Sequence, residues 1–552
     1  MKKEIQLISN FNIENLFNLI DNQIDKKQYY LAKPTYGLFQ DNAFKLLKSK
    51  NTKHLCIVWT QIEKILKSFD NLIHYNYKNV DKLAKETDEY INIIKQISKK
   101  TQFLIVFSWV LPKNERGKFL NDFTDKSGLT RNLNFVNNKI SEELKNYKNI
   151  FFLNSDFIIK DNNYDFNPKY WYLAKIPYSQ KVFETASEEI IKIINTINGK
   201  YIKLIVLDLD NTIWGGILGD LGWENITLGG HSATGEAFQD FQKKLKALSN
   251  LGIQLAISSK NDEKIALEAI NKNKNMILKE KDFVTWKINW SDKAKNIQEI
   301  IKELNLTNDN VLFLDDNISE RERVKRSLKG INVPDLPKDP CLYIETLLNL
   351  GCFEYGKELT KEDLNRSNYY KENKKRDKFK ETFISEDEWI KSLNTKVIFN
   401  KINKENTKRI LQLINRTNQM NLTTRRMSDK DLEKLKKKKN NHLYCCEVKD
   451  KFGDMGIVGF FNLELNKGKA FIRDFILSCR AFGREIEKGM LFKISQLLKN
   501  NKINFLELNY IKTKKNKPCY TFLKNNFKET KKYNFIYKDT KTIKIPKNLT
   551  IK

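Results

Sequence analysis

A short apolar run in the middle of the chain ends in two aspartates that are one residue apart. The run, 204–207, has the composition of a buried parallel strand, and Asp208 and Asp210 follow where open α/β sheets present ligand-binding groups. Two carboxylates this close repel each other unless a cation lies between them, and Mg²⁺ prefers oxygen ligands. One carboxylate can then attack a phosphorus centre while its neighbour handles the proton. A lone Asp-x-Asp, however, is more often a polar turn after a strand.

Three further polar motifs come later in the chain, each at the expected end of a strand or start of a helix. The apolar run 253–257 leads to Ser259, whose hydroxyl can hold a phosphoryl oxygen. Lys293 lies at the predicted start of an amphipathic helix and supplies one positive charge. A third apolar run, 310–314, leads directly into Asp315 and Asp316. Taken together, these motifs outweigh the turn interpretation.

This order of motifs resembles that of the haloacid dehalogenase (HAD) superfamily, and longer stretches are similar to its FkbH-like branch. The stretches are 207–216, 259–262, 313–322 and 415–426. The resemblance extends over essentially the whole chain, including 8–11 near its start. It implies an α/β multidomain protein with an SGNH-like α/β domain, a HAD-like Rossmannoid domain with a parallel sheet, and a GNAT-like α+β domain.

The resemblance implies a HAD-type phosphatase or phosphotransferase with Mg²⁺ as its cofactor. Asp208 would form an aspartyl-phosphate, and Asp210 would protonate the leaving oxygen and later deprotonate water. The implied residues are Asp208, Asp210 and Lys293 for catalysis, Ser259, Lys260 and Thr212 for the substrate phosphate, and Asp208, Asp210, Asp315 and Asp316 for the metal. Asp210 would contribute its backbone carbonyl to the metal, and Asp316 a supporting contact.

In the best-understood members of this family, the resemblance implies capture of 1,3-bisphosphoglycerate, removal of phosphate and loading of a glyceryl unit onto an acyl carrier protein. This chain has Ser258 where a cysteine often precedes the Ser-Lys-Asn motif, so phosphate hydrolysis or direct transfer stays open. We expect a phosphorylated acyl or sugar-like small molecule as the substrate and a carrier protein as the partner. The alternatives are a stand-alone sugar-phosphate phosphatase in surface-polysaccharide biosynthesis and a non-catalytic carrier-protein-binding scaffold.

The 552-residue chain has a formal net charge of +31, which raises the question of a nucleic-acid partner. Its lysines are spread along the chain and accompanied by many Asn and Ile residues. The densest run, 436–439, fits a solvated helix end, and no nucleic-acid-binding motif accompanies it. We therefore expect no nucleic-acid partner, whereas an acidic carrier protein would suit the basic surface.

The apolar runs and the cysteines restrict the compartment. The longest apolar run is far too short to span a membrane, and the start of the chain shows no signal-peptide pattern. The seven cysteines are scattered and never spaced as Cys-x-x-Cys. These features predict a cytoplasmic protein with no membrane partner, no disulfide framework and no zinc site.

Composition and periodicity predict four segments. These are the SGNH-hydrolase-like α/β domain 1–198, the HAD-like domain 199–353, a charged helical connector 354–395 and the GNAT-like domain 396–552. In the HAD-like segment, the glycine-rich stretch after Thr212 is too short for a cap domain and predicts a hairpin-like flap over an open site.

The first segment alternates apolar strands with helical stretches, which predicts a parallel sheet. Its predicted strands are 5–8, 55–59, 103–107 and 150–153, with helices over 80–97 and 131–147. The SGNH resemblance would make Ser9 a nucleophile. None of the four histidines lies in the base motif that such an enzyme needs near the end of the domain. We expect Ser9 to be a strand-end or capping residue and this domain to bind or position a partner.

The last segment shows a helix, three strands and a second helix, which resembles the GNAT fold. The predicted elements are 405–415, 443–448, 456–465, 470–477 and 483–500. Arg480 and Gly483 match the pyrophosphate-binding loop of that fold, but Glu485 replaces its last small residue. Coenzyme A binding, binding of a phosphopantetheine arm, docking alone and a purely structural role all stay open for this segment.

Overall fold

The structure is a computed structural model, and it divides the chain into two compact units. The first comprises Met1–Ile194 with Met427–Asp431, and the second Asn195–Arg426 with Leu432–Lys552. The structure describes residues 2–34, 37–49, 52–76, 80–112, 122–124, 127–147, 149–160, 162–163, 165–230, 232–304, 306–351, 353, 372, 376, 379–380, 382–466, 468–478, 481–513, 516–537, 543 and 546–551.

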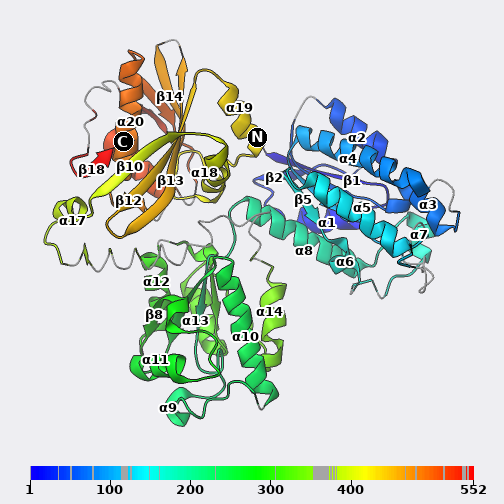
Figure 1. The fold of residues 1–552 in the computed structure, drawn as a ribbon, viewed down its shortest axis with the longest axis horizontal. Coiled ribbons are helices and arrows are strands. Elements are labelled where there is room, and N and C mark those ends of the chain that lie inside the picture. Colours follow the sequence, from blue (N-terminus) through cyan, green and yellow to red (C-terminus); the bar gives the residue numbers. More distant parts are fainter. Residues whose placement is uncertain are drawn as a thin grey trace. The chain divides into compact units, whose positions relative to one another are not determined.

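The first unit is built on a parallel sheet of five strands in the order β2-β1-β3-β4-β5. The strands are β1 (Lys3–Ser9), β2 (Tyr29–Leu31), β3 (Lys53–Trp59), β4 (Thr101–Phe107) and β5 (Ile150–Leu153). The main helices are α1 (Glu14–Gln23), α2 (Phe39–Lys48), α3 (Lys67–Ile73), α4 (Leu83–Lys100), α5 (Leu129–Leu144) and α8 (Gln180–Ile197). They cover both faces of the sheet (Figure 1), so its three central strands become apolar and buried toward their carboxyl ends, whereas their first residues are polar.

The second unit contains a parallel sheet of four strands in the order β8-β7-β6-β9. The strands are β6 (Leu204–Leu207), β7 (Gln254–Ser259), β8 (Phe283–Ile288) and β9 (Val311–Leu314). Successive residues of β6 point to opposite faces. Leu204 and Val206 pack with α12 (Lys293–Glu303) and α13 (Ile318–Ser327). Ile205 and Leu207 pack with α10 (Ala233–Asn250) and α11 (Glu263–Lys272). Burial on both faces explains the uninterrupted apolar run.

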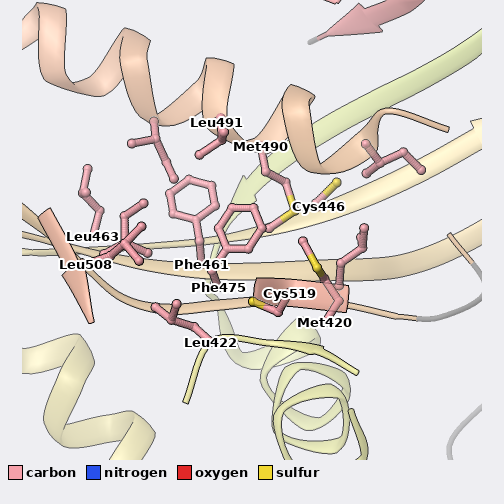
Figure 2. Close-up of a cluster of buried hydrophobic side chains, with 14 of the residues drawn as sticks. Met420, Leu422, Cys446, Phe461, Leu463, Phe475, Met490, Leu491, Leu508 and Cys519 are labelled. Atoms are coloured by element: carbon pink, nitrogen blue, oxygen red, sulfur yellow. The ribbon is translucent and has the colours of Figure 1, made fainter. Parts of the chain in front are cut away.

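The second unit also contains a nine-stranded, mostly antiparallel sheet in the order β16-β17-β15-β14-β13-β12-β10-β18, with β11 paired to β14. Its strands are β10 (Thr395–Lys401), β11 (Met420–Asn421), β12 (Asn441–Asp450), β13 (Gly453–Asn466), β14 (Lys469–Leu477), β15 (Leu506–Asn509), β16 (Lys528–Lys531), β17 (Asn534–Tyr537) and β18 (Leu549–Ile551). Its helices are α17 (Glu386–Ser392), α18 (Lys404–Arg416), α19 (Asp429–Lys437), α20 (Ile486–Asn500) and α21 (Lys517–Asn526). Figure 2 shows Met490 and Leu491 of α20 packed over Phe461 and Phe475 of the sheet.

The predicted α/β multidomain fold is confirmed, with two parallel sheets and one α+β region. All predicted strands are present, and β6 has the predicted bounds. The sequence did not reveal β2, β8, β10, β11 or β15–β18. Most of the predicted connector 354–395 lies outside the described residues, apart from α17 and single positions such as Arg376. The Arg376 guanidinium is buried and forms an ion pair of 2.6 Å with the Asp450 carboxylate.

No helix in the described part of the chain combines the length and the hydropathy that a bilayer crossing requires.

Candidate active site

The carboxyl edge of the four-stranded sheet brings together acidic residues from two strands that are distant in sequence. Asp208 follows β6 and Asp315 follows β9, and these strands are parallel neighbours. The Asp208 amide donates to the carbonyl of Leu314, which fixes Asp208 beside Asp315. Because parallel neighbours end at the same edge, residues more than one hundred positions apart meet there.

Lys293 joins these two carboxylates. It is the first residue of α12, whose N-terminus is capped by the Asp292 side chain accepting from the Lys295 amide at 2.9 Å. The Lys293 Nζ lies 2.9 Å from the Asp208 Oδ2 and 2.6 Å from the Asp315 Oδ2. Burial disfavours the charged ammonium, but the two carboxylates outweigh this effect and raise the pKa of Lys293. The lysine is therefore held as a cation.

The same edge has the donor set of a site for a hard divalent cation. One carboxylate oxygen from each of Asp208, Asp315 and Asp316 lies within 4.8 Å of the other two. Three carboxylates and one ammonium leave an excess of negative charge, and the buried Oδ1 of Asp208 has no hydrogen-bond partner among the residues that the structure describes. Burial raises the pKa of Asp315 to about 7, and it also raises the pKa of Asp316. An oxygen-preferring cation such as Mg²⁺ would compensate both the charge and the unpartnered oxygen.

Asp210 has a separate set of partners. Its Oδ1 accepts from the Trp214 indole at 2.9 Å and from the Leu218 amide at 3.2 Å. Its Oδ2 accepts from the Asn261 side-chain amide at 3.1 Å. Burial raises the pKa of this carboxyl, although the three donors oppose the shift. The Asp210 carboxyl is thus fixed in direction and less readily ionised than an exposed aspartate, which suits a group that gives and takes a proton.

The predicted phosphate-binding residues differ in where their side chains lie. Ser259 ends β7, is buried, and its hydroxyl accepts from the side-chain amide of Asn261 at 3.2 Å. Thr212 is buried, and its hydroxyl accepts from the Asp316 amide at 3.1 Å, so it supports the acidic loop. The Lys260 ammonium pairs with Glu320 at 2.7 Å. Ser259 and Thr212 thus contact residues of the site loops, whereas Lys260 pairs with a residue on α13.

Sequence reasoning missed three residues that hold the site in place. Arg321, buried on α13, donates to the backbone carbonyls of Asp315 and Asp316 at 2.9 and 2.7 Å. The hydroxyl of Tyr343 donates to the carbonyl of Asn211 at 3.0 Å. Trp214 reaches back to Asp210 through a turn in which Asn211 has φ +51°. The sequence carries one local signal of this turn, which is the Asn residue at position 211, because positions with a positive φ favour Asn or Gly.

The predicted flap and the predicted loop of the last segment are described in part. The flap contains the short helix α9 (Leu218–Leu221) and a bridge between Gly215 and Thr227. In the loop before α20, Arg480 lies outside the described residues and Gly483 has φ +72°. The Glu485 carboxylate pairs with Lys488 one turn further on.

In the first unit, Ser9 is buried at the end of β1. Its hydroxyl accepts from the Phe11 amide at 3.1 Å, which is the arrangement expected for a strand-end capping residue.

The comparisons with known proteins agree with this geometry. No family model matches the sequence, and no curated protein matches it significantly. Among solved structures, the chain is similar to the N-terminal part of the protein BF1531 from Bacteroides fragilis, which contains a phosphatase domain and was crystallised in complex with Mg. The sequence identity is 28%, the TM-score is 0.57, and the match covers 65% of this chain and 95% of that chain.

Two acetyltransferases match a smaller part of the chain. One is an acetyltransferase of the GNAT family from Staphylococcus aureus, at 17% identity and a TM-score of 0.22, covering 26% of this chain and 99% of that chain. The other is the PaiA N-acetyltransferase from Thermoplasma acidophilum in complex with coenzyme A, at 16% identity and a TM-score of 0.19, covering 25% of this chain and 96% of that chain. The stronger likeness, to a structure that contains a phosphatase domain, extends over about two thirds of this chain.

Proposed function

We propose that this protein is a Mg²⁺-dependent HAD-type phosphatase of the FkbH-like branch, which removes phosphate from a phosphorylated small molecule through an aspartyl-phosphate. The observation that carries the proposal is the position of the Lys293 ammonium between the carboxylates of Asp208 and Asp315, beside Asp316. The magnesium in the similar structure from Bacteroides fragilis supports the choice of metal.

In the first step, a carboxylate oxygen of Asp208 attacks the phosphorus atom of the substrate. A bond forms between that oxygen and phosphorus as the bond from phosphorus to the leaving oxygen breaks. Asp210, held by Trp214 and Asn261, gives its proton to the leaving oxygen. Lys293 keeps the Asp208 carboxylate oriented and, with the Ser259 hydroxyl, offsets negative charge on the phosphoryl oxygens. A cation held by Asp208, Asp315 and Asp316 would supply Lewis-acid charge to the same oxygens.

In the second step, water attacks the phosphorus atom of the aspartyl-phosphate. Asp210, now ionised, accepts the proton of that water, the bond between phosphorus and Asp208 breaks, and phosphate leaves. Both carboxyls are restored, so the cycle balances without a further reactant.

We propose further that the substrate is a phosphorylated acyl or sugar-like molecule, with 1,3-bisphosphoglycerate as the first candidate. In that case an acyl carrier protein would accept the glyceryl unit. The FkbH-like stretches and the net charge of +31, which favours an acidic partner, support this extension. The SGNH-like, HAD-like, connector and GNAT-like segments 1–198, 199–353, 354–395 and 396–552 remain our domain assignment, and the cytoplasm our proposed location.

The test is release of inorganic phosphate by the full chain from acyl phosphates and sugar phosphates, with Mg²⁺ or with EDTA. Turnover with Mg²⁺ that EDTA abolishes and added Mg²⁺ restores is the expected result, and full activity in chelator would contradict the proposal. Intact-mass spectrometry of carrier proteins after incubation with 1,3-bisphosphoglycerate then tests the acceptor. Free phosphate without an acylated carrier would favour the sugar-phosphate phosphatase.

A further inference from the structure

The first unit contains a cavity of about 500 Å³ that no step of the proposed phosphatase uses. Thr60 and Gln61, which follow β3, and Ser108, which follows β4, lie in its wall. The cavity is therefore at the carboxyl edge of the parallel sheet, where open α/β sheets bind ligands. Its volume is within the range of small-molecule pockets.

One side of the cavity is aromatic, and two of its rings lie on a helix with no buried residue. The short helix α7 (Lys169–Ala174) has no buried residue, although its sequence includes Trp171 and Tyr172. Both of these side chains line the cavity, together with Phe166 and Tyr178. Tyr178 is buried and stacks on Trp59, so folding explains that ring. Trp171 and Tyr172 instead leave apolar surface exposed, and we explain them as a platform for a ligand.

The charges in the wall are balanced, in contrast to the chain as a whole. Two carboxylates, Glu63 and Asp70, face two lysines, Lys64 and Lys160. The Lys160 ammonium is already paired with Asp156 at 2.6 Å, outside the cavity wall. In a chain of net charge +31, a cavity for a phosphate group would be expected to carry an excess of cations. The wall has no such excess, and its carboxylates can accept hydrogen bonds from hydroxyls.

We propose that this cavity binds a neutral sugar ring. A pyranose has an apolar face of C–H groups, which can pack on Trp171 and Tyr172, and a rim of hydroxyls, which can donate to Glu63 and Asp70. The site lies on a different sheet from the acidic cluster, so it adds a binding function to the proposed phosphatase and does not depend on it. The ring can belong to a free sugar or to the end of a longer glycan.

The test is saturation-transfer NMR of the full-length protein with neutral hexoses and N-acetylhexosamines, with short neutral glycans in a second arm and with hexose phosphates as the charged comparison. We expect transfer to the ring protons of at least one neutral sugar, as a free sugar or at a glycan end. Trp171→Ala should raise the dissociation constant at least about tenfold, because the aromatic platform is lost. Tyr172→Ala is the second variant, and Tyr30→Ala, an exposed aromatic of the same unit on β2, is the matched control that should bind normally.

Absence of binding by every neutral sugar and glycan would overturn the proposal. So would preference for hexose phosphates, or normal binding by both Trp171→Ala and Tyr172→Ala. Asp208→Asn separates the two sites, because the neutral sugar should still bind when the acidic cluster has lost its nucleophile. Loss of sugar binding in that variant would place the sugar at the acidic cluster and contradict the assignment.

Discussion

The protein contains two parallel sheets whose carboxyl edges carry different chemistry. The edge of the four-stranded sheet holds three carboxylates and one buried ammonium within a few ångströms. The edge of the five-stranded sheet has a serine that accepts from its own loop and a cavity lined by aromatic rings and balanced charges. Both sheets are covered by helices and built from apolar strands, so the scaffold is shared. The difference lies in the first residues after each strand.

This contrast shows that the residues at the ends of the strands, and not the strands themselves, determine the chemistry of each edge. Ser9 at the end of β1 accepts from the amide of Phe11, whereas Asp208 directly after β6 has one carboxylate oxygen with no partner among the described residues. A side chain that accepts from its own loop has a structural role, whereas a buried carboxylate oxygen without a partner, beside two further carboxylates, is where a cation would bind. The predictions below test this distinction.

The largest effect is expected for Asp208→Asn, which keeps the size of the side chain and removes the nucleophilic charge. Phosphate release should fall by at least about a thousandfold, because the covalent step is lost. Asp262→Asn is the matched control: Asp262 caps α11 by accepting from the Ile265 amide at 3.1 Å, and asparagine caps equally well. Near-normal turnover by Asp208→Asn would show that the Asp208 carboxylate, like the Ser9 hydroxyl, takes no part in the reaction.

The positions of the clustered carboxylates were predictable, but the groups that orient them were not. An apolar run such as 204–207 marks a buried strand, and parallel pairing brings the ends of β6 and β9 together. The strand β8 was missed because Trp286 and Lys287 are only half-buried and break the apolar pattern. The hydrogen bond from Trp214 to Asp210 depends on a turn at Asn211. The spacing of residues in the sequence does not predict which way the indole points.

The second prediction concerns the pH dependence of Mg²⁺ binding at the acidic edge. Burial raises the pKa of Asp315 to about 7, so without metal this carboxyl holds a proton below neutral pH. Because Mg²⁺ needs the ionised form, binding must release that proton, and affinity should rise by up to about tenfold per pH unit below pH 7 and level off above it. Calorimetry between pH 5.5 and 8 measures this, and a constant affinity would show that Asp315 is ionised throughout.

A smaller effect is expected for Trp214→Phe, which keeps the buried ring but removes the N–H that donates to Asp210. Turnover of alkyl phosphates, whose leaving group needs a proton, should fall about tenfold, as a misdirected acid loses part of its contribution. Aryl phosphates with a good leaving group should be nearly unaffected. Trp290→Phe, at a tryptophan that is 76% exposed, is the control. Equal losses on both substrates would assign Trp214 to folding alone.

The smallest effect is expected at the other edge, for Ser9→Ala. Phe11 is buried, so loss of the Ser9 hydroxyl leaves its amide without an acceptor and should cost about 1–3 kcal/mol of stability in the first unit. The matched control is Ser155→Ala, because the Ser155 hydroxyl is buried without a partner and its removal should not destabilise the unit. Hydrogen exchange of peptides covering β1 measures the loss, and phosphate release should be the same in both variants. If Ser9→Ala left exchange unchanged but reduced hydrolysis of a substrate, Ser9 would be a reactive group and the two edges would be more alike than their contacts indicate.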